Sequence, residues 1–237
     1  SACLVGSEMC IRDSFRTNHY IADIHFTFGS GVVYMSKRIG IFGGSFNPIH
    51  IGHLVIAEAA WQEFGLEKVL FIPSGDTPNK DMHHIDKHLR YNMVQKAIEG
   101  NEHFDISPIE REREGPSYTV DTIRLLRTSL SHDCQIFFIC GTDAIVDLPN
   151  WKYNKELLDS CDFIAASRPG SEIQLEESIR FFGETGIKKI HPLNTPELDI
   201  SSTKLRELIA NKKSARYFIP DNVLTYICLL YTSPSPR

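Results

Sequence analysis

Short apolar runs alternate along this chain with longer segments in which apolar residues recur every three or four positions. The short runs have the length and character of strands buried in a parallel sheet: 39–42, 69–72, 104–107, 135–140, 163–166 and 189–191. The periodic segments between them predict amphipathic helices. Strands and helices that alternate through short connections predict an α/β fold with an open, doubly wound parallel sheet. Ligands of such sheets bind at the carboxyl ends of the strands.

The helix predictions rest on spacing and on capping residues. In the helix predicted over 51–64, the side chains expected to be buried are spaced three, four and three apart: Leu54, Ala57, Trp61 and Phe64. Gly65 is suited to end it. Further helices are expected over 86–99, after a Ser117 cap through Leu126 or Leu125, after a Ser201 or Ser202 cap through 210, and with Pro220 in a first turn. Residues 110–114 alternate in charge, which predicts an exposed strand or turn.

The two ends of the chain lack these patterns. Residues 1–36 carry no periodic apolar face, and residues 1–14 and 228–237 are similar to translated adapter sequence. No basic region precedes a continuous apolar stretch, so a signal peptide is not indicated. We therefore predict a single domain over 37–227, an unassigned extension over 1–36, non-native or disordered, and a non-native tail over 228–237.

Composition excludes several classes of protein. The 237 residues are 42% hydrophobic, enough for a sizeable core, and the net charge is −5 without a basic stripe, which argues against a nucleic-acid partner. No apolar run approaches the ~20 residues of a membrane span. Cys134, Cys140 and Cys161 stand in apolar contexts and are predicted to be buried, reduced thiols, which fits the cytoplasm. The His-rich segment 83–88 matches no closed zinc spacing, so no metal site is predicted. The oligomeric state stays open, a homo-oligomer included.

The most informative segment lies between the first predicted strand and the first predicted helix: Gly43-Gly44-Ser45-Phe46-Asn47-Pro48-Ile49-His50-Ile51-Gly52-His53. Paired glycines let the backbone approach a ligand closely, and the helix N-terminus attracts phosphate. His50 and His53 can donate hydrogen bonds to a developing negative charge. Each feature alone has an ordinary structural explanation. Together, in this order, they predict a site for chemistry on a nucleotide phosphate.

A second candidate segment is Ile200-Ser201-Ser202-Thr203-Lys204-Leu205-Arg206. Hydroxyl groups at a helix N-terminus, with an arginine one turn later, would cradle a polyphosphate. Taken alone, a serine cap followed by a solvated arginine is the simpler interpretation.

These segments resemble two signatures of the nucleotidyltransferase superfamily, the second being the one with which its adenylyltransferases hold ATP phosphates. Three further segments are similar to those of bacterial nicotinate-nucleotide adenylyltransferases: 115–122, 141–143 and 150–151. Residues 167–170 resemble the family's Arg-Pro-Gly. Asn47 stands where Asp is commoner and is interpreted as a loop former. Segment 73–80 resembles a family loop, although Thr77 and Asn79 depart from it.

The resemblance implies one Rossmann-like nucleotidyltransferase domain that joins ATP to nicotinate mononucleotide and releases deamido-NAD and pyrophosphate, without a covalent intermediate. It implies catalytic roles for His50 and His53 and Mg²⁺ bound with ATP. The implied ATP-binding residues are Gly43, Gly44, Ser45, Phe46, Gly141, Asp143, Ile200, Ser201, Ser202 and Arg206. The implied mononucleotide-binding residues are Lys80, Tyr118, Thr119 and Trp151.

Four alternatives stay open at this point. A phosphopantetheine adenylyltransferase shares both ATP signatures, but residues 116–119 and Trp151 do not suit it. Nicotinamide mononucleotide is a rival acceptor. A class I aminoacyl-tRNA synthetase would need a Lys-Met-Ser-Lys-Ser-like segment, which this chain lacks. A nucleotide-binding module without catalysis is disfavoured because His50, His53 and Arg206 are intact.

Overall fold

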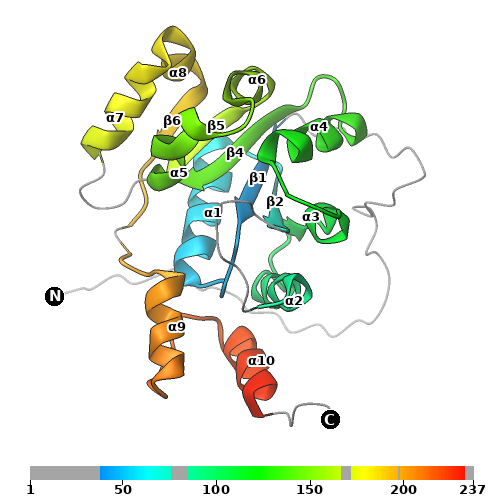
Figure 1. The fold of residues 1–237 in the computed structure, drawn as a ribbon, viewed down its shortest axis with the longest axis vertical. Helices are drawn as coiled ribbons and strands as arrows, with labels where there is room; N and C mark the ends of the chain where they lie inside the picture. Colours follow the sequence, from blue (N-terminus) through cyan, green and yellow to red (C-terminus); the bar gives the residue numbers. More distant parts are fainter. Residues whose placement is uncertain (1–37, 76–84, 167–171, 197, 233–237) are drawn as a thin grey trace, which may run out of the picture. The chain divides into compact units, whose positions relative to one another are not determined.

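Six parallel strands form one sheet in the computed structural model, which describes residues 38–75, 85–166, 172–196 and 198–232 (Figure 1). The strands are β1 (Arg38–Gly44), β2 (Lys68–Pro73), β3 (Phe104–Ile106), β4 (Gln135–Gly141), β5 (Asp162–Ala166) and β6 (Ile190–Leu193). Their order across the sheet is β3-β2-β1-β4-β5-β6, and every pairing is parallel. The strand order reverses between β1 and β4, where doubly wound sheets bind ligands. The predicted fold class is confirmed.

Helices pack around this sheet (Figure 1). Those that the sequence predicted are α1 (Ile51–Phe64), α2 (Lys87–Ala97), α4 (Thr119–Ser129), α9 (Ser202–Ala210) and α10 (Asp221–Thr232). Those that it did not predict are α3 (Ile109–Glu112), α5 (Thr142–Asp147), α6 (Asn154–Ser160), α7 (Glu172–Phe181), α8 (Gly183–Lys189) and the 3₁₀ turn η1 (Leu148–Asn150). Most of these span two turns or fewer, too short for a helical period to stand out in the sequence.

One hydrophobic core joins the sheet to helices from both the N-terminal and the C-terminal parts of the described chain. It includes Phe42 of β1 and Phe71 of β2, together with Leu205 of α9 and Val223 and Ile227 of α10. The strands read as continuous apolar runs because both faces of the sheet are covered. Since α9 and α10 share this core, the C-terminal signature folds as part of the same unit as the first one.

Helix α1 meets the core through smaller residues than predicted. Gly52, Ala57 and Ala60 are buried, whereas three of the predicted side chains are only partly buried and pack at the edge of the core: Leu54, Trp61 and Phe64. Gly65 ends the helix in the left-handed conformation with φ at 57°, as predicted.

Two details at helix ends differ from the predictions, and one open alternative is decided. Ser117 does not cap α4; the helix begins at Thr119, and Tyr118 occupies the cap position without a side-chain cap. Leu126, not Leu125, is buried in this helix. Pro220 precedes α10 and accepts the first helical hydrogen bond, from Leu224, so it is the cap residue and not part of the first turn.

The prediction of an exposed strand or turn over residues 110–114 was wrong. Residues Ile109–Glu112 form α3, and Glu110 is only 8% exposed. An alternating charge pattern normally marks a solvated segment, because a buried carboxylate needs partners that the pattern does not show. Here those partners come from two distant segments of the chain.

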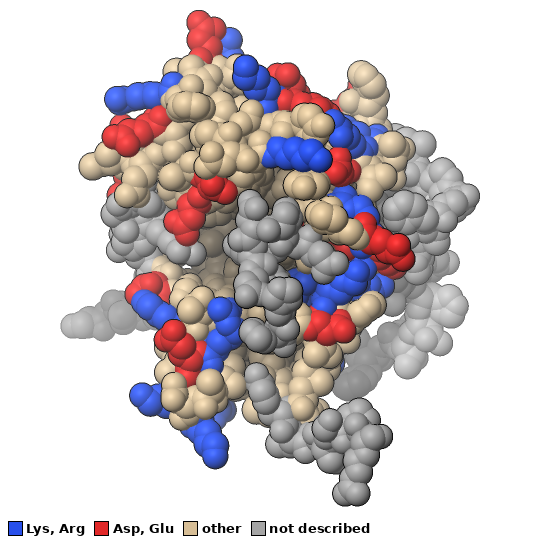
Figure 2. Space-filling model, in the orientation of Figure 1, with Lys and Arg blue, Asp and Glu red and all other residues tan. Residues whose placement is uncertain are grey.

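The surface and the thiols match the composition. Acidic and basic side chains are interspersed over the face shown in Figure 2. No helix among the described residues has the length and hydropathy to cross a membrane. Cys134, Cys140 and Cys161 are buried and form no disulfide, and burial raises the pKa of the Cys161 thiol to about 12. The predicted domain boundary at 227 falls inside α10, which continues to Thr232.

Candidate active site

The turn after β1 places two histidine rings against each other at the start of α1. His50 is the residue before the first helical turn, and its backbone N–H donates to Nδ1 of His53 over 3.2 Å. The two rings stack with centroids 3.6 Å apart. Because Nδ1 of His53 accepts a hydrogen bond, its neutral ring carries the proton on Nε2. His53 is therefore oriented as a donor through Nε2.

Phe46 supports the His53 ring from the core. Its backbone has φ at 45° and its side chain is 1% exposed. The Phe46 ring lies edge-on to His53 at 5.1 Å and to Phe42 at 5.5 Å. The side chain of Phe46 is thus part of the core, so only its backbone is left to meet a ligand.

Two glycines of the turn leave room for neighbouring rings. A Cβ on Gly52 would lie 3.1 Å from Nδ1 of His50, and one on Gly43 would lie 2.8 Å from the ring of Phe138. Contacts at these distances are tighter than ordinary van der Waals packing. Both positions therefore need glycine for packing, in addition to any approach of a ligand.

Helix α9 brings the second candidate segment onto the first. The Ser202 hydroxyl donates to the Pro48 carbonyl over 2.9 Å, and Nη1 of Arg206 donates to the Asn47 carbonyl over 2.7 Å. Ser201 caps α9 by accepting from the backbone N–H of Lys204 at 3.3 Å, as one of the two predicted caps. These partners lie 154 and 159 residues apart in the sequence, so only folding unites the two segments.

Ile200 and the glycine turn are also in proximity. A Cβ on Gly52 would lie 3.7 Å from Cβ of Ile200, and Ile200 packs against the hydrophobic core. The two candidate segments therefore lie against each other at the start of α1.

The predicted mononucleotide residues are linked to the end of β1 through aromatic contacts. Trp151 follows η1, donates from Nε1 to Asp147 over 3.2 Å, and packs edge-on against Phe138 at 6.1 Å. Phe138 is the ring that fills the space beside Gly43. Nζ of Lys152 lies 4.2 Å from the centre of the Tyr118 ring, which brings the start of α4 beside Trp151.

The carboxyl end of β4 completes the edge. Gly141 ends β4, and among the described residues no atom except those of its chain neighbours lies within 4 Å of the position that a Cβ would take there. Asp143 lies in the first turn of α5, beside Thr142, whose hydroxyl donates to the Ala166 carbonyl of β5 over 3.2 Å. Lys80 and residues 167–170, which the sequence also placed at this edge, lie outside the described residues.

Sequence reasoning missed two buried charged residues beside the turn. Arg90 of α2 is 2% exposed and donates to the Ser45 carbonyl over 2.9 Å. Glu110 accepts from the backbone N–H of Gly75 at 3.2 Å. A signal existed for Arg90: it precedes the buried Met93 and Val94 by three and four positions, on the apolar face of its helix.

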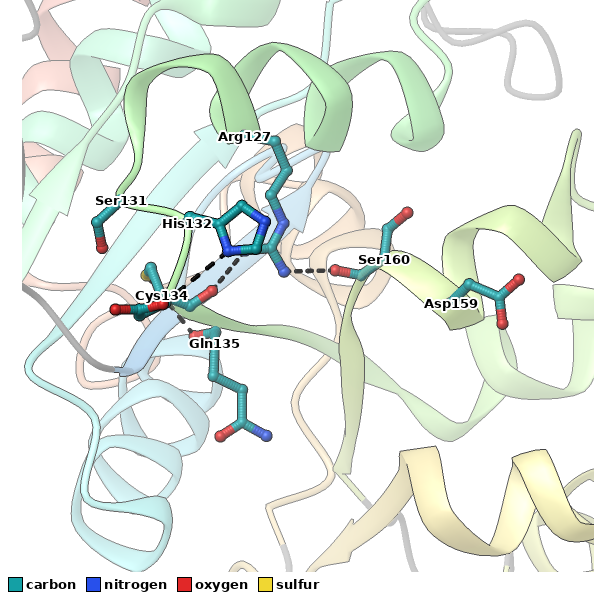
Figure 3. A pocket seen from close by; sticks show the side chains of 8 residues that line it. Arg127, Ser131, His132, Cys134, Gln135, Asp159 and Ser160 are labelled. Carbon is teal, nitrogen blue, oxygen red and sulfur yellow. Dashed lines mark hydrogen bonds and ion pairs between the residues drawn. The ribbon is translucent and has the colours of Figure 1, made fainter.

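One pocket lies away from this edge (Figure 3). Its volume is about 520 Å³, and its lining includes Arg127, His132, Gln135 and Ser160. Gln135 begins β4, whereas Gly141 ends it, so the pocket is at the amino end of the strand. Arg127 already donates to the carbonyls of Cys134 and Ser160. We assign this pocket no part in the predicted chemistry.

Comparison with known proteins agrees with this geometry. The model of the family described as cytidylyltransferase-like matches residues 41–208. A probable nicotinate-nucleotide adenylyltransferase of Moorella thermoacetica is 45% identical over 192 residues, which cover 80% of this chain and 88% of that protein. The nicotinate-nucleotide adenylyltransferase of Bacillus subtilis is 39% identical, over 81% of this chain and 95% of its own.

Solved structures give the same fold at lower identity. The nicotinic acid mononucleotide adenylyltransferase of Plasmodium falciparum, complexed with NaAD, aligns with a TM-score of 0.64 at 20% identity. The alignment covers 82% of this chain and 96% of that one. At this identity the likeness supports the architecture of the sheet and its helices.

Proposed function

Since the chain belongs to the cytidylyltransferase-like family, with relatives named nicotinate-nucleotide adenylyltransferases, we propose that it adenylylates nicotinate mononucleotide. The mononucleotide phosphate attacks the α-phosphorus of ATP. The bond between the α-phosphorus and the oxygen that bridges it to the β-phosphorus breaks, and pyrophosphate leaves. The product is deamido-NAD. The attacking phosphate oxygen is already an anion, so the step needs neither a general base nor a covalent intermediate.

The observation that carries this proposal is the junction of two helix N-termini at one loop. His50 is the N-cap residue of α1 and Ser201 is that of α9, while Ser202 and Arg206 donate to the Pro48 and Asn47 carbonyls between them. Each helix N-terminus carries a partial positive charge. Two such ends beside an arginine and two histidines form a site that favours the chain of negative charges on a nucleoside triphosphate.

Within this site we assign His53 to the transition state. Its Nδ1 accepts from the His50 backbone, so the proton of the neutral ring is on Nε2, and we assign that proton to charge that develops on the α-phosphate oxygens. Donors of this kind are fixed before the reaction, so they cost no reorganisation in the transition state. His50, whose ring stacks on His53, shares the same phosphates.

Metal chemistry would depend on the nucleotide. Among the residues that the structure describes, no three His, Cys, Asp or Glu side chains are grouped to hold a metal ion. The oxygens of ATP would therefore supply most ligands of a bound Mg²⁺, which keeps several non-protein ligands in such sites. When bound with ATP, Mg²⁺ would neutralise charge on the departing pyrophosphate.

The acceptor would lie between the start of α4 and Trp151. Backbone N–H groups at Tyr118 and Thr119, at the helix N-terminus, suit a carboxylate, and the Trp151 ring suits stacking on a pyridine.

The compartment completes the proposal. Three buried thiols without a disulfide suit a reducing compartment, and we propose that the protein acts in the cytoplasm.

The test is pyrophosphate release from ATP with nicotinate mononucleotide, nicotinamide mononucleotide or phosphopantetheine as acceptor. We expect kcat/KM for the acid to exceed that for the amide by at least ~10-fold, because an amide would direct its own donors at N–H groups. Trp151→Ala should weaken the binding of both mononucleotides and leave the ratio of their kcat/KM values unchanged. Equal values for acid and amide would refute the nicotinate assignment, and activity only with phosphopantetheine would refute the pyridine acceptor.

A further inference from the structure

The Gly75 peptide is held from both sides by buried charged groups. Its carbonyl accepts from Nη2 of Arg90 at 3.4 Å, and its N–H donates to Oε2 of Glu110 at 3.2 Å. Arg90 and Glu110 are 2% and 8% exposed. A peptide between a guanidinium and a carboxylate is held by charge-assisted hydrogen bonds at both ends, here at long distances.

Arg90 also contacts the turn after β1, and Glu110 also contacts helix α4. Nη1 of Arg90 donates to the Ser45 carbonyl over 2.9 Å, within the turn after β1. Oε1 of Glu110 accepts from the Thr122 hydroxyl over 2.6 Å, in the first turns of α4. The Thr122 hydroxyl is also 3.4 Å from the Tyr118 carbonyl. A continuous path of hydrogen bonds thus joins Ser45 to the start of α4.

The space around Gly75 is closed. A Cβ there would lie 2.5 Å from the Glu110 carbonyl oxygen and 2.6 Å from the Ser117 hydroxyl. A backbone oxygen and a buried hydroxyl therefore fill the side of Gly75 from which a Cβ would project, so the position accepts no side chain.

We infer that Arg90 and Glu110 are positioning residues, which set the distance between the ATP loop at Ser45 and the mononucleotide segment at Tyr118–Thr119 through the Gly75 peptide. The inference rests on the proposed function and adds to it two residues that touch neither substrate. In-line transfer between two bound substrates depends on this distance, and a misplacement of about 1 Å costs about 10²-fold in rate.

The experiment compares four variants with the wild-type protein. Glu110→Gln keeps the shape of the side chain, but its amide NH₂ group cannot accept a hydrogen bond, so either the Gly75 N–H or the Thr122 hydroxyl loses its acceptor. Thr122→Val removes only the hydroxyl, and Thr122→Ser keeps it. Glu112→Gln is the matched control, since Glu112 lies on the same short helix α3 with a side chain 56% exposed.

We expect Glu110→Gln and Thr122→Val to lower kcat at saturating substrates by about 10- to 100-fold, with KM for ATP within about threefold of wild type. Thr122→Ser should recover most of the loss, and Glu112→Gln should match wild type. Hydrogen exchange at the Gly75 amide should become faster in Glu110→Gln, a readout that is independent of activity.

Unchanged kcat in both Glu110→Gln and Thr122→Val, with an active wild type, would overturn the positioning role. The role would also be overturned if Glu110→Gln and Thr122→Val lowered kcat, ATP affinity and melting temperature together and Thr122→Ser showed the same losses, because that result marks a purely structural role. A wild-type protein that transfers to no mononucleotide would instead refute the proposed function, and the coupling of these residues to it.

Discussion

Replacement of His53 separates its two roles in this structure. Nδ1 accepts from the His50 backbone and stabilises the start of α1, whereas Nε2 is the proposed donor to the transition state. His53→Ala removes both. His53→Asn returns an acceptor, Oδ1, near the place of Nδ1, but provides nothing at the position of Nε2. The pair of variants therefore distinguishes a catalytic from a structural histidine.

The expected magnitudes follow from the contacts. Loss of a cap acceptor costs about 0.5–2 kcal/mol, and loss of the edge-on contact with Phe46 at 5.1 Å costs about 0.5–1.5 kcal/mol more. His53→Ala should therefore lower the free energy of unfolding by about 1–3 kcal/mol, a fall in Tm of roughly 3–10 °C for a domain of this size. His53→Asn should recover the cap contribution. Both variants should lose about 10²- to 10³-fold in kcat, the effect of removing one preorganised donor.

The assay is kcat for pyrophosphate release at saturating ATP and mononucleotide, with thermal unfolding measured on the same preparations. If His53→Asn regained both the stability and most of the kcat, His53 would act only by holding the turn. The reasoning about Nε2 would then be refuted.

Two further predictions concern stability. Burial acts to raise the pKa of Asp162, but hydrogen bonds from His191 and Lys189 outweigh burial and lower the pKa. The Asp162 carboxylate should therefore stabilise the fold fully above about pH 4, its pKa in the unfolded chain, and this stabilisation should be lost as the pH falls through the lower pKa of the folded state. Asp162→Asn should reduce the loss of stability in acid and lower the free energy of unfolding at pH 7 by about 1–3 kcal/mol. A denaturant midpoint equal to that of the wild type, both at pH 7 and in acid, would contradict this. Deletion of residues 1–36 and 228–237 should leave kcat unchanged and cost at most about 1 kcal/mol, because Ile227 is buried while Leu229 and Leu230 are 59% and 40% exposed; loss of the cooperative transition would show that the predicted boundaries are too narrow.

The sequence alone determined the strands, five of the helices and the two signatures, because these depend on local patterns. A strand covered on both faces must be apolar throughout, and α1 and α9 carry a period and a cap within a few residues. The turn proposed to bind ATP could be predicted because Gly43, Gly44, His50 and His53 lie close together in the chain. Trp151 and Tyr118 were predicted only through their resemblance to family segments.

Tertiary structure decided how these parts meet. The bonds from Ser202 and Arg206 to the loop at Asn47 span more than 150 residues, and no local pattern encodes such pairings. Glu110 shows the limit most clearly, since an alternating charge run predicts exposure. Its burial is tolerated only because the Gly75 N–H and the Thr122 hydroxyl satisfy both carboxylate oxygens. The energy of a buried charge depends on partners that folding brings from elsewhere, so composition and spacing cannot determine it.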